Sequence, residues 1–93
     1  MLQITVYYMK DGSHFIQKVF DSEKNETLAA FDESTGYIDL SVCEPYIGQN
    51  IEVLKISEEP DGQFVIDYQK TTVLEDVGVD ENGLKFIRYS IED

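Results

Sequence analysis

The sequence predicts a mainly β fold, an antiparallel meander of six or seven short strands that forms a small barrel or a bent sheet. Three observations support this prediction. Apolar and polar residues alternate along several segments, as in strands with one buried face. Turn-forming pairs such as Asp11-Gly12 and Asn82-Gly83 separate these segments. The turns are short, and short turns join strands that are consecutive in the sequence.

The first predicted hairpin covers residues 2–9 and the strand that follows Asp11-Gly12. An Asp-Gly pair between alternating segments predicts a two-residue type I′ turn. That turn sets the register of the two strands. The expected pairs on the apolar face are Tyr8 with Phe15, Val6 with Gln17, and Ile4 with Val19. The expected pairs on the opposite face are Met9 with His14 and Tyr7 with Ile16.

Residues 21–36 allow two interpretations. Ser22 could cap a short helix that runs to Glu33, which would make the fold α+β with one helix at residues 22–33. Alternatively, Gly36 closes a hairpin loop between a strand at 27–31 and another at 37–42. The hairpin is preferred because too few apolar residues share a helical face. Cys43-Glu44-Pro45 should end the strand at 37–42, since proline cannot donate to a ladder.

The most informative segment, residues 51–73, contains two alternating runs on either side of Pro60-Asp61-Gly62. This sequence predicts a type I turn closed by a left-handed Gly62, with Glu59 opposite Gln63. The register then brings apolar residues opposite apolar residues and opposite charges together. The expected pairs are Ile56 with Ile66, Leu54 with Tyr68, Lys55 with Asp67, and Glu52 with Lys70.

The C-terminal part is predicted to be an acidic connector, Glu75 to Glu81, followed by a strand from Leu84 to Ile91. Gly78 suggests a bulge, and Asn82-Gly83 suggests a type I′ turn. This turn would place Asp80 opposite Lys85 and Val79 opposite Phe86. No linker or repeat is evident, so residues 1–93 are expected to form a single domain.

The net charge of −12, from 19 acidic and seven basic residues, limits the possible partners. An acidic surface repels nucleic acid phosphate and anionic lipid, so neither is an expected partner. It attracts basic protein surfaces. The start of the chain has no basic region of the kind found in signal peptides, and the single cysteine excludes an internal disulfide. These features predict a cytoplasmic protein.

Catalytic and metal sites are not predicted. His14 is the sole histidine and follows a turn, where a half-packed imidazole is ordinary. Cys43 has acidic neighbours, which disfavour a reactive thiolate. The segment from Asp76 to Gly83 partly matches a calcium loop, but Glu81 and Ile87 stand where that loop needs glycine and a bidentate acid. The chain is therefore expected to be non-catalytic and to have no cofactor.

Acidic residues concentrate in the predicted turns, and a meander would gather them at its two ends. The candidate partner-binding residues are Asp32, Glu33, Glu58, Glu59, Asp61, Glu75, Asp76, Asp80 and Glu81. Exposed tyrosines between them could anchor a partner. The sequence thus favours a small inhibitor or decoy that occupies a basic, nucleic-acid-binding surface of another protein. In composition alone it resembles small acidic immunity proteins and phage-encoded anti-restriction or anti-CRISPR inhibitors.

The alternative function is an accessory or structural domain of a larger assembly, in which acidity serves solubility. Regular rows of carboxylates on one face would favour the decoy, whereas scattered carboxylates would favour the accessory domain. The oligomeric state is left open by the sequence. An exposed sheet edge could pair with another chain.

Overall fold

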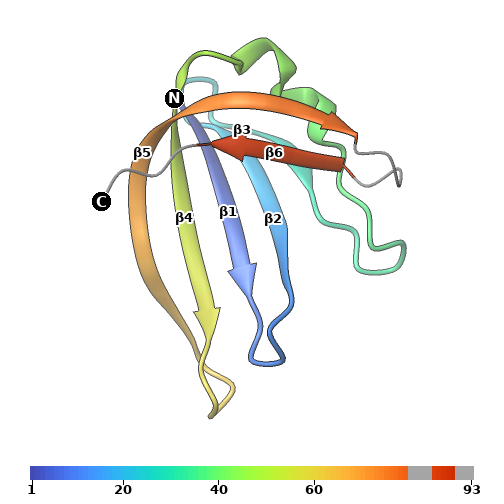
Figure 1. The fold of residues 1–93 in the computed structure, drawn as a ribbon, viewed down its shortest axis with the longest axis vertical. Coiled ribbons are helices and arrows are strands. Elements are labelled where there is room, and N and C mark those ends of the chain that lie inside the picture. Colours follow the sequence, from blue (N-terminus) through green and yellow to red (C-terminus); the bar gives the residue numbers. More distant parts are fainter. Residues whose placement is uncertain (80–84, 90–93) are drawn as a thin grey trace.

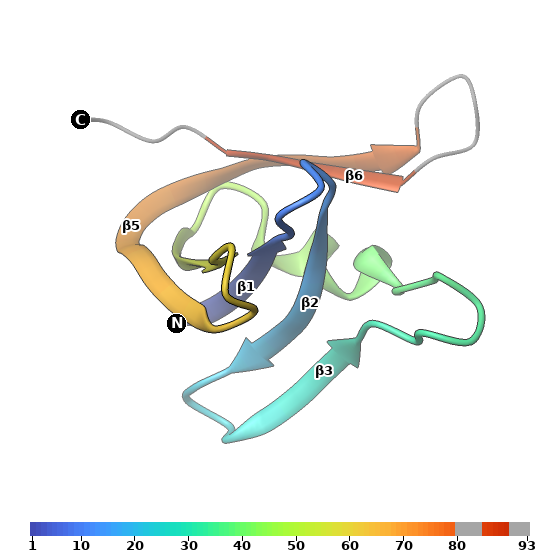
Figure 2. The same cartoon turned by 90° about the horizontal axis from the view of Figure 1, so that it is seen from below.

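The computed structural model describes residues 1–79 and 85–89, which form a mainly β half-barrel with one 3-10 helix (Figures 1 and 2). The sheet elements and the helix, η1, have the following bounds: β1 Leu2–Tyr8, β2 His14–Asp21, β3 Glu26–Ala30, η1 Leu40–Tyr46, β4 Asn50–Glu58, β5 Phe64–Val79 and β6 Lys85–Tyr89. The prediction of a mainly β fold with a bent sheet is confirmed.

The order of the described strands is β3-β2-β1-β4-β5-β6, and β1 runs parallel to β4. The prediction of a purely antiparallel meander is therefore wrong. Parallel neighbours need a crossover of a dozen or more residues, which β3 and η1 supply between β2 and β4. As a consequence, the β1–β2 and β4–β5 hairpins lie side by side and point in the same direction (Figure 1).

Both hairpins have the same three-residue loop. The backbone N–H of Met9 donates to the Ser13 carbonyl, as that of Glu59 does to the Gln63 carbonyl. Gly12 and Gly62 have φ values of 91° and 86°, in the region that favours glycine. The predicted turn at Pro60-Asp61-Gly62 is confirmed. The predicted two-residue turn at Asp11-Gly12 is wrong because Lys10 also belongs to the loop.

The β1–β2 register contains a β-bulge at Gln17, the extra residue between the pairs Thr5–Lys18 and Val6–Ile16. Ile4 pairs with Val19 as predicted, because both lie beyond the bulge. The other predicted pairs are wrong by one residue, because the longer loop shifts them. The observed partners there are Val6 with Ile16, Tyr7 with Phe15, and Tyr8 with His14.

The β4–β5 register contains an equivalent bulge at Asp67. Ile56 pairs with Ile66 as predicted. Beyond the bulge the predicted pairs are wrong: Lys55 faces Tyr68, Leu54 faces Gln69, and Glu52 faces Thr71. Asp67 still forms an ion pair with Lys55, with 3.6 Å between Nζ and Oδ2, and accepts a hydrogen bond from the Ser57 hydroxyl. A bulge places its two residues toward one side of the sheet, which keeps Asp67 near Lys55.

No helix forms at residues 22–33, so the α+β alternative is wrong. The carboxylate of Asp21 instead accepts the backbone N–H groups of Glu23 and Lys24, which fixes a turn into β3. The preferred hairpin is also wrong, since β3 pairs with β2. Between β3 and residues 37–42 there is one isolated bridge, from Asp32 to Tyr37, within the described chain.

The predicted strand at 37–42 is replaced by η1. Asp39 caps this helix, because its carboxylate accepts the backbone N–H of Ser41 at 3.0 Å. Leu40 and Cys43 are buried on the side that faces the half-barrel, and Pro45 lies inside the last turn. The capping residue and the two buried side chains favour a helical turn over an extended strand.

Strand β5 continues through most of the predicted acidic connector, up to Val79. Its first part pairs with β4 and its second part with β6, so β5 bends across the sheet (Figure 1). Leu74 marks the change of partner, because its backbone bonds to Gly48 and Gln49. The bulge lies at Glu75 rather than at the predicted Gly78.

The register of β6 also differs from the prediction. Val79 pairs with Lys85 and Gly78 with Phe86. The predicted strand from Leu84 to Ile91 is observed over its described part, Lys85–Tyr89. Its ends at Leu84 and Ile91, Asp80, Glu81 and the Asn82-Gly83 turn lie outside the described residues.

The core lies on the inner, concave side of the sheet, under β5, β6 and η1. Its fully buried strand residues are Leu2, Ile4, Val19, Ile51, Val53 and Leu74. On β1 and β4 they alternate with residues of the outer face. Figure 2 shows β6 crossing over β1 and β2 on the inner side.

Asp21 makes the fold sensitive to acid. The carboxylate belongs to a residue that is 4% exposed, and it accepts the Tyr46 hydroxyl at 2.7 Å. That hydrogen bond, with those from the turn backbone, lowers the pKa of Asp21 below 3.8. A lowered folded pKa gives stability that is present above the unfolded pKa and lost as the pH falls through the folded pKa.

We therefore expect wild type to lose stability below about pH 4, where the unfolded chain binds protons more readily than the folded one. Asp21→Asn should be less stable than wild type at pH 7 and should lose less stability on acidification. Urea unfolding at pH 7, 4 and 3 measures both effects. Equal losses in the two proteins would contradict this role. Glu26→Gln, an exposed change in the same region, serves as the control.

Candidate binding surfaces of the half-barrel

The outer, convex face carries an apolar surface close to the two hairpin loops. This outer patch consists of Tyr7, Phe15, Leu54, Ile56, Phe64 and Ile66. Phe64 is 47% and Ile66 is 66% exposed. Tyr7 pairs with Phe15 on one side and Ile56 on the other, and Ile56 pairs with Ile66. The outer patch therefore extends without interruption across β2, β1, β4 and β5.

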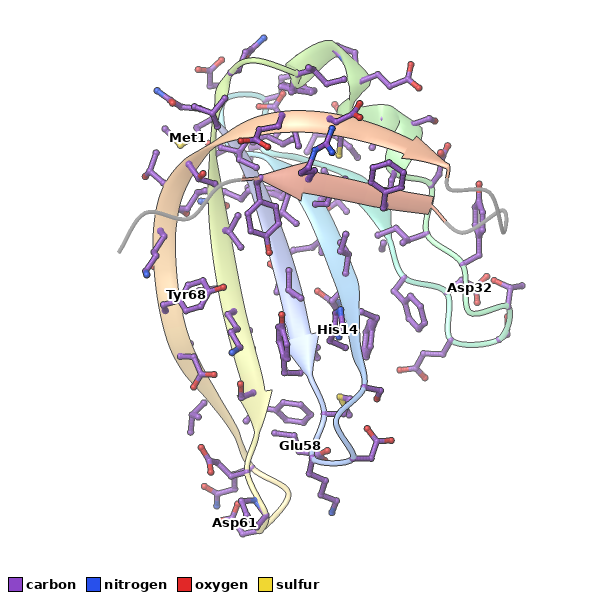
Figure 3. All side chains as sticks on the ribbon, in the orientation of Figure 1. Met1, His14, Asp32, Glu58, Asp61 and Tyr68 are labelled. Carbon is purple, nitrogen blue, oxygen red and sulfur yellow. The ribbon has the colours of Figure 1, made fainter. Side chains whose placement is uncertain are left out.

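The bulge at Asp67 is the reason that the patch exists. In an unbroken strand, Phe64, Ile66 and Tyr68 would share one face. The extra residue resets the alternation, so Tyr68 turns to the inner face while Ile66 and Phe64 stay on the outer face. Figure 3 shows Tyr68 directed over the inner face. Sequence reasoning missed this patch because a bulge leaves the alternating pattern unchanged.

Four aromatic rings form a row along the patch and past its edge. The ring centroids are 5.4 Å apart for Phe64 and Tyr7, 5.7 Å for Tyr7 and Phe15, and 4.4 Å for Phe15 and Phe31. The rings are tilted by 32–44°. These distances are within the range of favourable aromatic contacts. The rings therefore hold one another in place before any partner binds.

Carboxylates border this patch at the hairpin loops. We call Asp11, Glu58, Glu59 and Asp61 the tip acids. The Glu58 carboxylate accepts the backbone N–H of Lys10 at 3.1 Å, which joins the two loops. Asp11 and Asp61 each accept the backbone N–H two residues later, so they also shape the loops. Figure 3 shows Glu58 and Asp61 together at this end.

The hydrogen bonds of Asp11 keep it ionised. The hydroxyl and the backbone N–H of Ser13 lower the pKa of the Asp11 carboxyl, the hydroxyl having the larger effect. Ser34 acts on Asp32 in the same way. Both carboxylates therefore carry a full negative charge at neutral pH.

The nine predicted partner-binding acids occupy separate places. Glu58, Glu59 and Asp61 come together at the hairpin end, with Asp11 as an addition. Asp32 and Glu33 follow β3, and Asp32 lies away from that end (Figure 3). Glu75 and Asp76 lie on β5, where Arg88 is 3.8 Å and 3.1 Å from them. Asp80 and Glu81 lie outside the described residues.

The inner face contains a cavity of about 530 Å³ between β1, β2, β6 and the segment that follows β3. We call it the inner cavity. Its aliphatic lining comes from Val6, Ile16, Ile38, Leu40 and Ile87. Its rings come from Tyr8, His14, Phe15, Phe31, Phe86 and Tyr89. A cavity of this size and composition is typical of small-molecule sites.

The polar groups of the described cavity lining are two tyrosine hydroxyls and one imidazole, and one lysine lies beside them. His14 stacks on Tyr8, with ring centroids 5.0 Å apart and 13° between the planes. The Lys55 ammonium lies 4.2 Å from the centroid of the Tyr8 ring. Burial, then the nearby Tyr68 and Tyr8 hydroxyls, raise the pKa of Tyr89. The Tyr89 hydroxyl therefore remains protonated at neutral pH and can donate a hydrogen bond.

Among the described residues that line the cavity, no serine, cysteine or carboxylate side chain stands beside His14 as nucleophile or orienting group. Across residues 1–79 and 85–89, no cluster of three His, Cys, Asp or Glu residues could hold a metal ion. The same residues include no helix of the length and hydropathy needed to cross a bilayer.

Cys43, on the inward side of η1, is fully buried, and burial raises the pKa of its thiol to about 11. The reactive species is the thiolate, so the folded protein should resist alkylation at pH 8. We expect Cys43 to react with a thiol reagent at the rate of unfolding, and about as fast as free cysteine in urea. Reaction with 5,5′-dithiobis(2-nitrobenzoate) measures both rates. Rapid labelling of the folded protein would contradict the burial.

Comparison of the chain with models of known families, with curated proteins and with solved structures found no match.

Proposed function

We propose that this protein is a non-catalytic binding module, and that the outer patch together with the tip acids contacts a partner protein. The single observation that supports this most strongly is an aromatic row, with Phe64 exposed and the other three rings half-buried, beside four carboxylates. Exposed aromatic side chains are the usual anchors of protein interfaces. The rings already pack on one another, so a partner would bind them at a small cost in side-chain entropy.

The charge of the tip acids defines the partner. Four carboxylates and Lys10 lie on the two loops, and the whole chain carries −12. A partner with an apolar site flanked by lysines or arginines would complement this arrangement. Its association would be accelerated by the opposite charges and would slow as salt is added.

In its most concrete form, the proposed module is an inhibitor that occupies a basic, nucleic-acid-binding surface of its partner. The tip acids would take the place of phosphates, and the outer patch would supply affinity that phosphate mimicry lacks. The other described acids stand on separate elements and form no single row, which by the criterion given above favours the accessory domain. The inhibitor is supported by the local group Glu58, Glu59, Asp61 and Asp11 beside the outer patch, and we assign the contact to these four residues.

An affinity capture experiment tests this proposal. The protein is used as bait in lysate of its source cell, with washes at low and high salt and with competing DNA. The proposed inhibitor retains a nucleic-acid-binding protein at low salt and releases it when DNA is added. A partner that is indifferent to both salt and DNA indicates the alternative, an accessory subunit. Retention of no protein contradicts both forms of the binding module.

A further inference from the structure

The inner cavity and the outer patch lie on opposite faces of the sheet and share Phe15, which borders both. The aliphatic lining residues of the cavity and Tyr8 lie on the concave side. Among the described lining residues, the polar groups are on Tyr8, His14 and Tyr89, and the other side chains are apolar. Such an arrangement orients a ligand by a few hydrogen bonds and binds its body through apolar contact. The partner interface described above makes no use of these groups.

We propose that the inner cavity binds an uncharged aromatic small molecule with one hydrogen-bonding group. The ring-rich lining fits a planar apolar body. The Tyr8 and Tyr89 hydroxyls and the His14 imidazole can each donate and accept, so they match a neutral polar group.

The two electrostatic effects near the cavity act in opposite directions. The Lys55 ammonium, 4.2 Å from the centroid of the Tyr8 ring, repels an organic cation at short range and attracts an anion. The net charge of −12 repels an anion over a longer distance and attracts a cation. Neither sign of charge is favoured by both, and a charged ligand would also lose its hydration on entering an apolar lining, whereas an uncharged ligand avoids that cost. The cavity volume of about 530 Å³ accommodates a molecule with two or three fused rings.

Three naphthalene derivatives of similar size test the proposed ligand class: 2-naphthol, naphthalene-2-carboxylate and 2-naphthylmethylammonium. Titrations of the full chain are followed by NMR of isotope-labelled methyl groups. We expect 2-naphthol to bind at least about tenfold more tightly than either ion. Its shifts should fall on Ile16, Ile38 and Ile87. Equal or tighter binding of an ion, shifts on Ile56 and Ile66, or failure of 2-naphthol to saturate would overturn the proposal.

Variants separate the cavity from its polar end. Ile38→Trp fills the cavity and should lower the affinity for 2-naphthol by about tenfold or more. His14→Phe keeps the ring on Tyr8 but removes the hydrogen bond. It should lower the affinity for 2-naphthol by about fivefold and leave the affinity for unsubstituted naphthalene unchanged. Ile66→Ser on the outer face should leave both affinities unchanged. If His14→Phe weakens both compounds equally, or Ile66→Ser weakens them, the assigned site is wrong.

Discussion

The double substitution Phe64→Ser with Ile66→Ser will lower the affinity for the partner by at least about 100-fold while the fold stays intact. Central aromatic and aliphatic anchors typically contribute about 2 kcal/mol or more each, and about 1.4 kcal/mol corresponds to a factor of ten. Both side chains are largely exposed, so their loss removes little from the core. Calorimetric titration of the captured partner measures the affinity, and thermal unfolding measures the fold.

The matched control for this double variant is Val73→Ser. Val73 is 41% exposed on the outer face of the same strand but lies at the opposite end from the patch. It should leave the affinity within about twofold of wild type. If Val73→Ser weakens binding as much as the double variant, general hydrophobicity rather than the outer patch explains the interaction.

Charge can be tested on the same surface. Glu58→Gln and Glu59→Gln together should slow association and reduce its dependence on salt, because they remove two of the four tip acids. The dissociation rate should change less. Glu23→Gln with Glu26→Gln, in the β2–β3 turn region, removes the same charge elsewhere. An equal effect from both pairs would mean that net charge, not the tip acids, guides the partner.

Deletion of Asp67 will leave the half-barrel folded, whereas deletion of Leu54 from β4 will prevent folding. Asp67 is the extra residue of the bulge, so its removal leaves Ile66 and Tyr68 on their present faces and makes the ladder regular. The loss comprises one part-exposed ion pair and one hydrogen bond, which together contribute about 1–2 kcal/mol. Urea unfolding measures this difference.

Leu54 has no bulge beside it on β4, which pairs with β1 and β5 on its two sides. Its deletion shifts one side of β4 by one residue. Either Ile51 and Val53 turn out of the core, or the residues of β4 after position 54 exchange their inner and outer faces. Each buried aliphatic lost costs about 2–5 kcal/mol, against a total stability of about 5–15 kcal/mol. Circular dichroism should show an unfolded chain. A folded Leu54 deletion, or an unfolded Asp67 deletion, would contradict the register described here.

The sequence by itself determined the features that depend on near neighbours. Alternation located most of the strands, and Pro60-Asp61-Gly62 determined its turn because proline and glycine each restrict a dihedral angle there. Ile56 with Ile66 was also predictable, because the turn and the apolar faces agree on that pair. Ile4 with Val19 was predicted correctly because the bulge at Gln17 offsets the extra loop residue, Lys10. The acidic residues at the second hairpin could be named from the sequence as well.

The tertiary structure decided what depends on contacts between distant segments. The parallel pairing of β1 with β4 follows from packing two hairpins over one core, and no local pattern encodes it. Residues 37–42 become part of a loop and η1 because Leu40 and Cys43 are buried there. The bulge at Asp67 keeps Phe64 and Ile66 on the outer face while Tyr68 lies on the inner face. The bend of β5 at Leu74 brings β6 over the inner face, where Phe86, Ile87 and Tyr89 line the inner cavity. Alternation of period two is the same with or without a bulge, so the sequence could not show which apolar residues remain exposed.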